Sequence, residues 1–229
     1  MRRFYETAAI AEDGPPHALL LDDKPVMTPQ RRRLELPSRA LAEALAQEWQ
    51  SQGPDLVPTT MPLTRLAHGA IDLVTPDPSR AISEIAGYAG SDLLCYRAES
   101  PVALAVQQAK GFDPILAWAA GLLGTGFETV VGVMPRPQPA ETLEALSRLL
   151  AAQDPFRLIA LHAITTLTGS AILALALAEG RITPQEAWSA AHVDEDWQIS
   201  QWGEDADAMQ RRAAQEIEFL AAARLLELI

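Results

Sequence analysis

The sequence predicts an α+β fold, in which a small N-terminal antiparallel β domain precedes a larger, mostly α-helical domain. Short apolar runs separated by turn residues fill positions 1–37, whereas apolar residues from Ser38 onward recur mostly at helical spacing. In addition, 48% of the 229 residues are hydrophobic, which is typical of a globular chain with a substantial core.

The N-terminal segment reads as four short strands that end in a helix. The strands are separated by the sequences Gly-Pro-Pro, Asp-Asp and Thr-Pro-Gln, all of which favour turns. The strand candidates are RRFYETAAI, HALLLDD, KPVMT and RRRLELP. Ser38 then caps a helix in which Leu41, Leu45 and Trp49 recur every four residues. We therefore expect this β domain, with its final helix, to occupy residues 1–55.

The remaining residues, 56–229, are expected to form the mainly helical domain. Helices are expected at 61–74, 78–90, 101–123 (as one or two) and 139–150, and strands at 92–98 and 127–135. Thr183 to Glu186 forms a capping box with proline at the first helical position, which predicts that a helix starts there. Gly203 is expected to precede the last helix.

Leu158 to Ala178 is an uncharged stretch of 21 residues, long enough to span a bilayer. However, a histidine, three threonines, a glycine and a serine occupy its middle. A single mid-chain span without basic flanks would also be poorly specified. We therefore interpret the stretch as one central helix buried by its neighbours, and we expect no stable membrane insertion.

Charge and cysteine content restrict the partners and the compartment. The chain has 18 Lys and Arg against 30 Asp and Glu, a net charge of −12 that disfavours nucleic acid and anionic membranes as partners. The single Cys95 excludes an internal disulfide and fits a reducing compartment. No apolar run follows the N-terminal arginines, so no secretory signal is expected.

Motifs for nucleophilic, nucleotide and metal chemistry are missing from the sequence. It contains no Gly-x-Ser-x-Gly elbow and no glycine-rich loop followed by Lys and Ser or Thr. The four histidines include no His-x-x-x-His pair, and His192 and Asp194 would lie about 200° apart on a helix. We therefore expect no cofactor and no bound metal.

The segment HVDEDWQISQWGEDADA, residues 192–208, contains six carboxylates and two tryptophans without Lys or Arg. If residues 184–202 form one helix, Glu195 falls inside an apolar stripe that includes Trp202. A carboxylate there is costly unless it is paired. It is therefore either a buried Glu bound to an internal Arg or helix N-terminus, or a site that awaits a cationic partner group. A hydrolase with acid/base carboxylates in segment 194–205 is the catalytic alternative, although no sugar-binding cleft is evident.

The last helix is expected to present an apolar face and a local ion pair. Its apolar face is predicted to consist of Met209, Ala213, Ile217 and Leu220. Asp207 can reach Arg211 at four-residue spacing.

Six segments, taken together and in order, resemble one family. They are EWQSQ (48–52), MPLTRLAHGAID (61–72), YAGSDLLCYRAESP (88–101), QQAKGFDPILAW (107–118), EAWSAAHVDEDWQ (186–198) and WGEDADA (202–208). In this order they are similar to the assembly chaperones that escort the α subunit of the soluble catalytic sector of F-type ATP synthase. Phe112 departs from the tryptophan expected before Asp-Pro, which is a conservative aromatic exchange.

The resemblance implies a small β domain and a larger helical domain, and it implies no catalysis. It also implies a client, the free α subunit, whose surface is normally covered by the β subunit. The chaperone would prevent aggregation of this client until assembly, acting as a monomer in the bacterial cytoplasm, or in the mitochondrial matrix if the chain is eukaryotic.

The resemblance also carries over a set of partner-binding residues. These are Glu204 and Asp205, supported by Asp194 and Glu195, together with Trp202 and Trp49. The acids would pair with basic groups of the client. For Trp49, packing in the core is the alternative to contact. Asp92 and Arg97 are expected to form an internal ion pair that links the domains.

Overall fold

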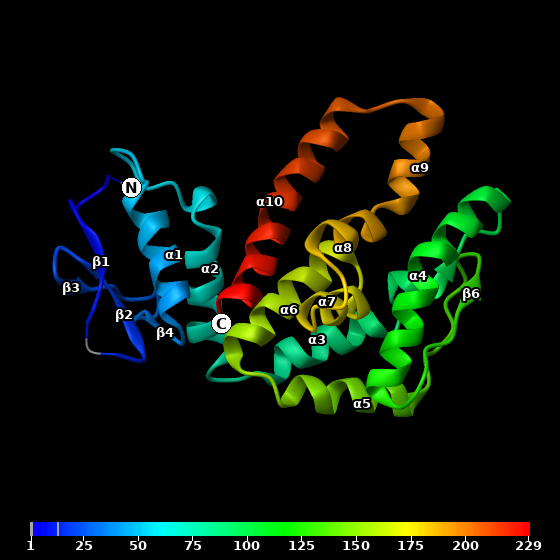
Figure 1. The fold of residues 1–229 in the computed structure, drawn as a ribbon, viewed down its shortest axis with the longest axis horizontal. Helices are drawn as coiled ribbons and strands as arrows, with labels where there is room; N and C mark the ends of the chain where they lie inside the picture. Colours follow the sequence, from blue (N-terminus) through cyan, green and yellow to red (C-terminus); the bar gives the residue numbers. More distant parts are fainter. Residues whose placement is uncertain (1, 13) are drawn as a thin grey trace.

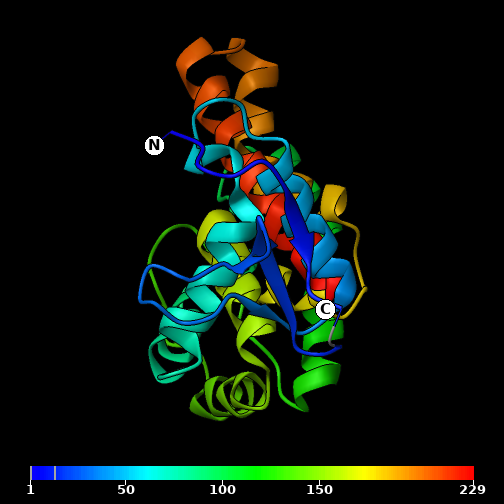
Figure 2. The same ribbon diagram turned by 90° about the vertical axis from the view of Figure 1, so that its left-hand side faces the viewer.

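The computed structural model describes residues 2–12 and 14–229 and confirms the α+β class. Figure 1 shows the N-terminal strands gathered at one end of an elongated molecule, with helices filling the centre and a short strand pair beside α4 (Val102–Leu123) at the other end. The C-terminal helix crosses the molecule from a protruding hairpin to the helices next to the sheet (Figures 1 and 2).

The N-terminal sheet is antiparallel and centred on β2. Its strands are β1 (Ala8–Ile10), β2 (His17–Leu21), β3 (Lys24–Pro25) and β4 (Glu35–Leu36). β2 pairs with all three others, with Ala9 opposite Leu20 in the β1 pairing. Alternate residues of β2, Leu19 and Leu21, are buried, and α1 (Arg39–Gln50) packs against β1 and β2. As expected, Ser38 caps α1 by accepting a hydrogen bond from the Leu41 amide.

The rest of the chain is helical apart from one short pair of parallel strands. In order, it contains η1 (Pro58–Thr60), α2 (Pro62–Gly69), the π-helical turn η2 (Ala70–Val74), α3 (Ser79–Ala89), η3 (Leu93–Cys95), β5 (Tyr96–Arg97), α4 (Val102–Leu123), β6 (Val130–Val131) and α5 (Ala140–Ala151). It continues with α6 (Pro155–Thr168), α7 (Ala171–Ala178), α8 (Pro184–Ala191), α9 (Val193–Trp202) and α10 (Ala206–Leu228).

The central apolar stretch is two helices rather than one, so the expectation of a single helix is wrong. Gly169 has a left-handed φ of 69°, which ends α6, and Ser170 caps α7 by accepting from the Leu173 amide at 3.0 Å. Its burial is confirmed, because residues 171–176 are at most 2% exposed. Among the described helices, none combines the length and apolar character needed to cross a membrane.

We expect Gly169→Ala to lower the free energy of unfolding by about 1 kcal/mol, because a side chain at positive φ is strained. No neighbouring atom would contact the added Cβ, so the effect isolates the backbone strain. Gly87→Ala is the matched control, since Gly87 lies in α3 at ordinary φ with open space around it. That change should be neutral or stabilising by about 0.5–1 kcal/mol. Urea titrations followed by circular dichroism measure the free energy of unfolding of both variants. Equal effects would contradict the strained backbone conformation assigned to Gly169.

The N-terminal core extends beyond the sheet and α1. Buried residues of α2, α6 and α10 pack in the same cluster as those of the sheet. Glu48 of α1 accepts hydrogen bonds from the Leu63 and Thr64 amides at 2.8 Å and thereby supplies the first turn of α2 with acceptors. The division at residues 55 and 56 stays a prediction about folding units, because packing is continuous across it.

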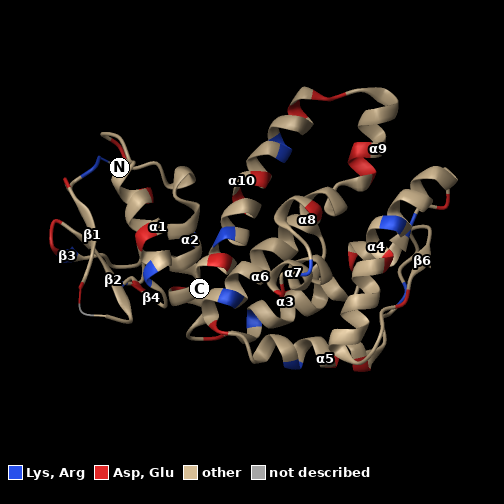
Figure 3. Ribbon diagram, viewed as in Figure 1, with Lys and Arg blue, Asp and Glu red and all other residues tan. Residues whose placement is uncertain are grey.

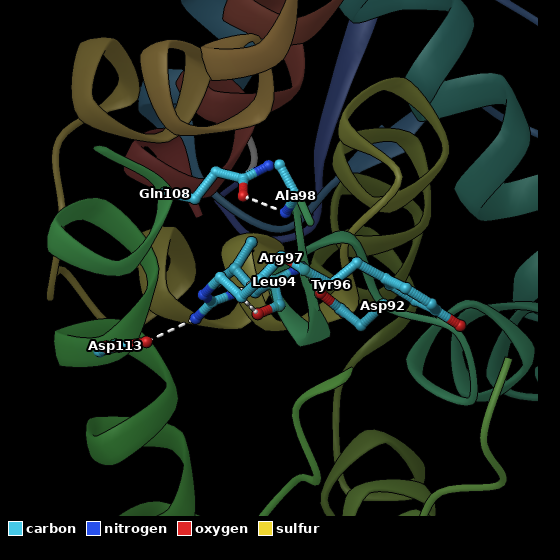
Figure 4. A network of polar contacts seen from close by, with 7 residues as sticks. All are labelled: Asp92, Leu94, Tyr96, Arg97, Ala98, Gln108 and Asp113. Atoms are coloured by element: carbon cyan, nitrogen blue, oxygen red, sulfur yellow. Dashed lines mark hydrogen bonds and ion pairs between the residues drawn. The ribbon is translucent and has the colours of Figure 1, made fainter. Parts of the chain in front are cut away.

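Asp92 and Arg97 do not form the ion pair that the sequence suggested. The Asp92 carboxylate accepts from the Ser170 hydroxyl at 2.6 Å and from the Leu94 and Ile172 amides at 3.1 Å. Arg97 instead bonds Asp113 of α4 at 2.5 Å (Figure 4). The strand expected over 92–98 is correspondingly shorter, because Asp92 caps the 3-10 turn η3 before β5 begins. Both residues therefore tie segments of the helical region together.

Candidate protein-binding surface

α9 and the first half of α10 form a hairpin that projects from the helical body (Figure 1). Gly203 ends α9 with φ 88° and ψ 176°, a conformation that favours glycine. Asp205 then caps α10, accepting from the Ala208 amide at 2.8 Å. These two residues fix the tip between the helices.

The base of the hairpin is a cluster of aromatic rings. The Trp188 ring lies 4.0 Å from the His192 ring and 5.0 Å from the Phe219 ring, measured between centroids. His192 Nδ1 is 2.8 Å from the Trp188 carbonyl oxygen, and the backbone at His192 (φ −114°, ψ 16°) leaves the helical conformation. A single helix over 184–202 is therefore wrong, because α8 ends before His192 and α9 begins after it.

This break changes the environment of Glu195. The expected place in an apolar stripe is wrong, since the Glu195 side chain is 61% exposed. Arg212 of α10 lies 4.0 Å from it and bonds the neighbouring Asp196 at 2.5 Å, which joins the two helices of the hairpin. Asp207 and Arg211, which were expected to pair within α10, form no ion pair with each other in the structure. Glu195 is thus an exposed acid on the side of the hairpin.

Asp194 faces the helical body rather than solvent. It accepts from Gln108 Nε2 of α4 at 2.7 Å, and Gln108 Oε1 accepts from the Ala98 amide at 2.7 Å. The second contact is drawn in Figure 4. Gln108 is 4% exposed, so this relay is internal. The role of Asp194 in this structure is to fasten α9 to α4.

A groove of about 470 Å³ runs between α9 and α10. Its lining includes Glu195, Trp202 and Asp205, three of the residues that the sequence singled out. Arg211 and Arg212 also line it, so the groove itself is of mixed charge. Glu204 is exposed in the connecting loop beside it. The hairpin therefore brings four predicted site residues to one end of the molecule.

Large apolar side chains are exposed on the hairpin and on the adjoining part of α10. Trp202 is 80% exposed, Ile217 58% and Leu220 40%. The apolar face that the sequence assigned to α10 is therefore largely exposed to solvent. The core instead receives Phe219 and Leu225, which lie outside this stripe. Because α10 carries apolar residues on more than one side, the sequence pattern identifies this stripe but does not show that it is exposed.

Trp49, the remaining predicted contact, lies outside this surface. It is 8% exposed in the N-terminal core, where its ring packs 5.6 Å from that of Tyr5. The Tyr5 hydroxyl donates to the Trp49 carbonyl oxygen at 2.6 Å. A partner that docks on the folded chain reaches little of this side chain, which corrects the contact interpretation in favour of packing.

The hairpin offers negative charge and apolar area, not catalytic groups. Figure 3 shows acidic positions on α9 and at the start of α10. Residues 2–12 and 14–229 contain no group of three metal-binding side chains. Cys95 is buried, and desolvation, together with the Asp92 charge, raises the pKa of its thiol to about 12. Such a thiol is not a nucleophile at neutral pH.

Residues 2–120 match the family model described as ATP12 chaperone protein. The chain belongs to the ATP12 chaperone family. This confirms the resemblance stated from the six sequence segments, and it makes the protein a chaperone for ATP synthase assembly rather than an enzyme. Nothing supports the hydrolase alternative.

Solved structures of ATP12 relatives have the same fold over nearly the whole chain. Atp12 from Paracoccus denitrificans is 40% identical with a TM-score of 0.93, covering 99% of this chain and 97% of that one. A point mutant of the same Paracoccus protein is 39% identical, with the same coverage and TM-score. The Atu1473 protein of Agrobacterium tumefaciens, described as a candidate chaperone, is 46% identical with a TM-score of 0.93, covering 99% of this chain and 85% of that one.

Proposed function

We propose that the protein binds the unassembled α subunit of F-type ATP synthase and prevents its aggregation until it pairs with the β subunit. Membership in the ATP12 family supports a role in ATP synthase assembly. The observation that carries the proposal is the hairpin, where a tryptophan that is 80% exposed stands beside exposed carboxylates. We place this activity in the bacterial cytoplasm, or in the mitochondrial matrix for a eukaryotic chain, with the protein acting as a monomer.

The exposed surface of the hairpin fits a client that is itself missing a neighbour. A subunit separated from its assembly exposes apolar area that aggregates unless it is covered. Trp202, Ile217 and Leu220 offer apolar area for such a surface, and Glu204 and Asp205 provide charges for a basic rim. Aromatic residues surrounded by polar groups commonly dominate the energy of protein interfaces.

The direct test mixes purified α subunit with the chaperone and follows light scattering and co-elution. The proposal expects a complex and suppressed scattering. The same test with isolated β subunit measures selectivity. Absence of an α complex, at concentrations where α alone aggregates, would refute the choice of client while leaving the family assignment intact.

The double change Glu204→Gln and Asp205→Asn tests the acidic tip. Asn caps a helix about as well as Asp, so the pair removes charge while preserving the start of α10. We expect binding of the α subunit to weaken about tenfold, through loss of charge complementarity, and the melting temperature to change little. Glu6→Gln with Glu12→Gln is the control, since both residues are exposed and flank β1, away from the hairpin (Figure 1). If both variants bind the α subunit with equal affinity, Glu204 and Asp205 do not belong to the interface.

A further inference from the structure

A second groove, of about 580 Å³, lies between α4 and α8. Phe112, Ile115, Ile182 and Val193 contribute its apolar lining, and Gln107, Gln185 and Ser189 belong to its polar lining. Along α4 the groove extends from Gln107 to Ile115, which is about 12 Å of helix. It is therefore long enough for several side chains of a bound segment.

Two cations line this groove. Lys110 is the only basic residue of α4, visible as the blue segment on that helix in Figure 3, and Arg181 precedes α8. Both are exposed, and neither side chain forms a hydrogen bond or an ion pair with any residue the structure describes.

The nearby acids are already engaged. Glu186, which also lines the groove, accepts from the Thr183 amide at 2.8 Å and from the Thr183 hydroxyl at 3.0 Å, with Arg181 close enough to contribute to lowering its pKa. Asp113 is paired with Arg97, and Asp194 accepts from Gln108. The cations of Lys110 and Arg181 therefore remain available for a carboxylate from outside.

Proline inside α4 removes one regular hydrogen bond of the helix. Pro114 lies inside the helix and has no N–H, so the Lys110 carbonyl lacks its helical hydrogen bond. Residues 110 and 114 share one face of α4, and both line the groove. A donor of a bound segment can therefore satisfy this carbonyl.

We propose that the α4–α8 groove binds an acidic amphipathic segment of a protein partner, with apolar side chains on its floor and a carboxylate between Lys110 and Arg181. Amphipathic helices commonly bind in this way, with anchors spaced three or four residues apart. The groove is opposite in charge to the hairpin tip, so the two surfaces select different segments. The proposal does not depend on the identity of the client.

The test uses two labelled fourteen-residue peptides and the full chain. One peptide carries leucines at helical spacing flanked by glutamates, and the other has lysine in place of every glutamate. Fluorescence anisotropy should show binding of the glutamate peptide at least tenfold tighter than that of the lysine peptide. Lys110→Glu with Arg181→Glu should weaken binding of the glutamate peptide at least tenfold.

Three controls make the outcome decisive. Arg148→Glu with Arg224→Glu changes the net charge equally at exposed sites elsewhere and should leave peptide binding unchanged. Ser189→Trp, which fills the exposed rim, should abolish binding even if the charge reversal fails to fold. The Glu204→Gln and Asp205→Asn pair should have no effect, which separates this groove from the hairpin. The proposal would be overturned if neither peptide binds, if both bind equally, or if the groove substitutions leave binding unchanged. It would also be overturned if equimolar decanoate, a carboxylate with an apolar chain, displaces the peptide.

Discussion

Replacing Asp92 by Ala is expected to lower the free energy of unfolding by about 3–5 kcal/mol, because three buried donors lose their acceptor. The carboxylate is fully buried, and the Leu94 amide, the Ile172 amide and the Ser170 hydroxyl all bond to it. These donors belong to η3 and to the start of α7, so the change loosens the junction between them. Urea unfolding of the full chain provides the measurement.

Asp77→Ala is the matched control for this change. Asp77 also accepts from a backbone amide and a hydroxyl, those of Ser79, but it is exposed. Water can replace the lost acceptor there, so we expect a cost below about 1 kcal/mol. If the two substitutions lower the free energy of unfolding equally, the burial of Asp92 does not explain its effect.

The Asp92 effect should also depend on pH. Burial raises the pKa of Asp92 from 3.8 to about 6 in the folded chain, despite the hydrogen bonds that lower it. The folded state therefore takes up this proton before the unfolded state as pH falls, so the contribution of Asp92 to stability grows between pH 6 and pH 4. The deficit of Asp92→Ala relative to wild type should increase by about 2 kcal/mol over that range. If the stability difference between wild type and Asp92→Ala shrinks toward acid pH, the buried environment that raises the pKa of Asp92 would be contradicted.

Phe219→Ala is expected to cost about 3–5 kcal/mol, because it empties a fully buried site at the base of the hairpin. The Phe219 ring is 0% exposed and packs against Trp188, which in turn packs against His192 at the start of α9. Thermal and urea unfolding measure the loss, and near-ultraviolet circular dichroism reports the environment of Trp188.

Ile217→Ala separates packing from binding on the same helix. Ile217 is two residues away but 58% exposed, so its truncation should change stability by less than about 0.5 kcal/mol. If the apolar stripe of α10 contacts the α subunit, the same change should weaken that complex. A large loss of stability for Ile217→Ala would mean that this stripe packs inward after all.

The sequence predicted most helices correctly because helix caps and hydrophobic spacing depend on residues close together in the chain. Ser38 and Thr183 cap the helices that they were expected to cap, and the Thr183–Glu186 capping box forms both of its hydrogen bonds. The breaks after α6 and α8 were missed for a physical reason. Gly169 lies within a continuous uncharged run, and at the other break His192 contacts the Trp188 carbonyl oxygen, with no proline or glycine there to signal the end of a helix.

The candidate site was only partly predictable because exposure is a tertiary property. Glu195, Trp202 and Asp205 come from one short segment and do meet in the hairpin groove. Asp194 turns away, since Gln108, 86 residues earlier, supplies its hydrogen bond. No spacing rule connects residues that far apart.

The path of α10 has a mechanical consequence. Its 23 residues span about 34 Å as one uninterrupted helix. At its far end the Leu228 carbonyl accepts from the Ser38 hydroxyl, and along its length Glu218 bonds Arg65 of α2 at 2.5 Å. We expect a force that tilts the hairpin tip to be carried along α10 to its contacts with Ser38, next to α1, and with Arg65 of α2. We therefore infer that a partner bound to the hairpin would also load α1, which packs against the β sheet.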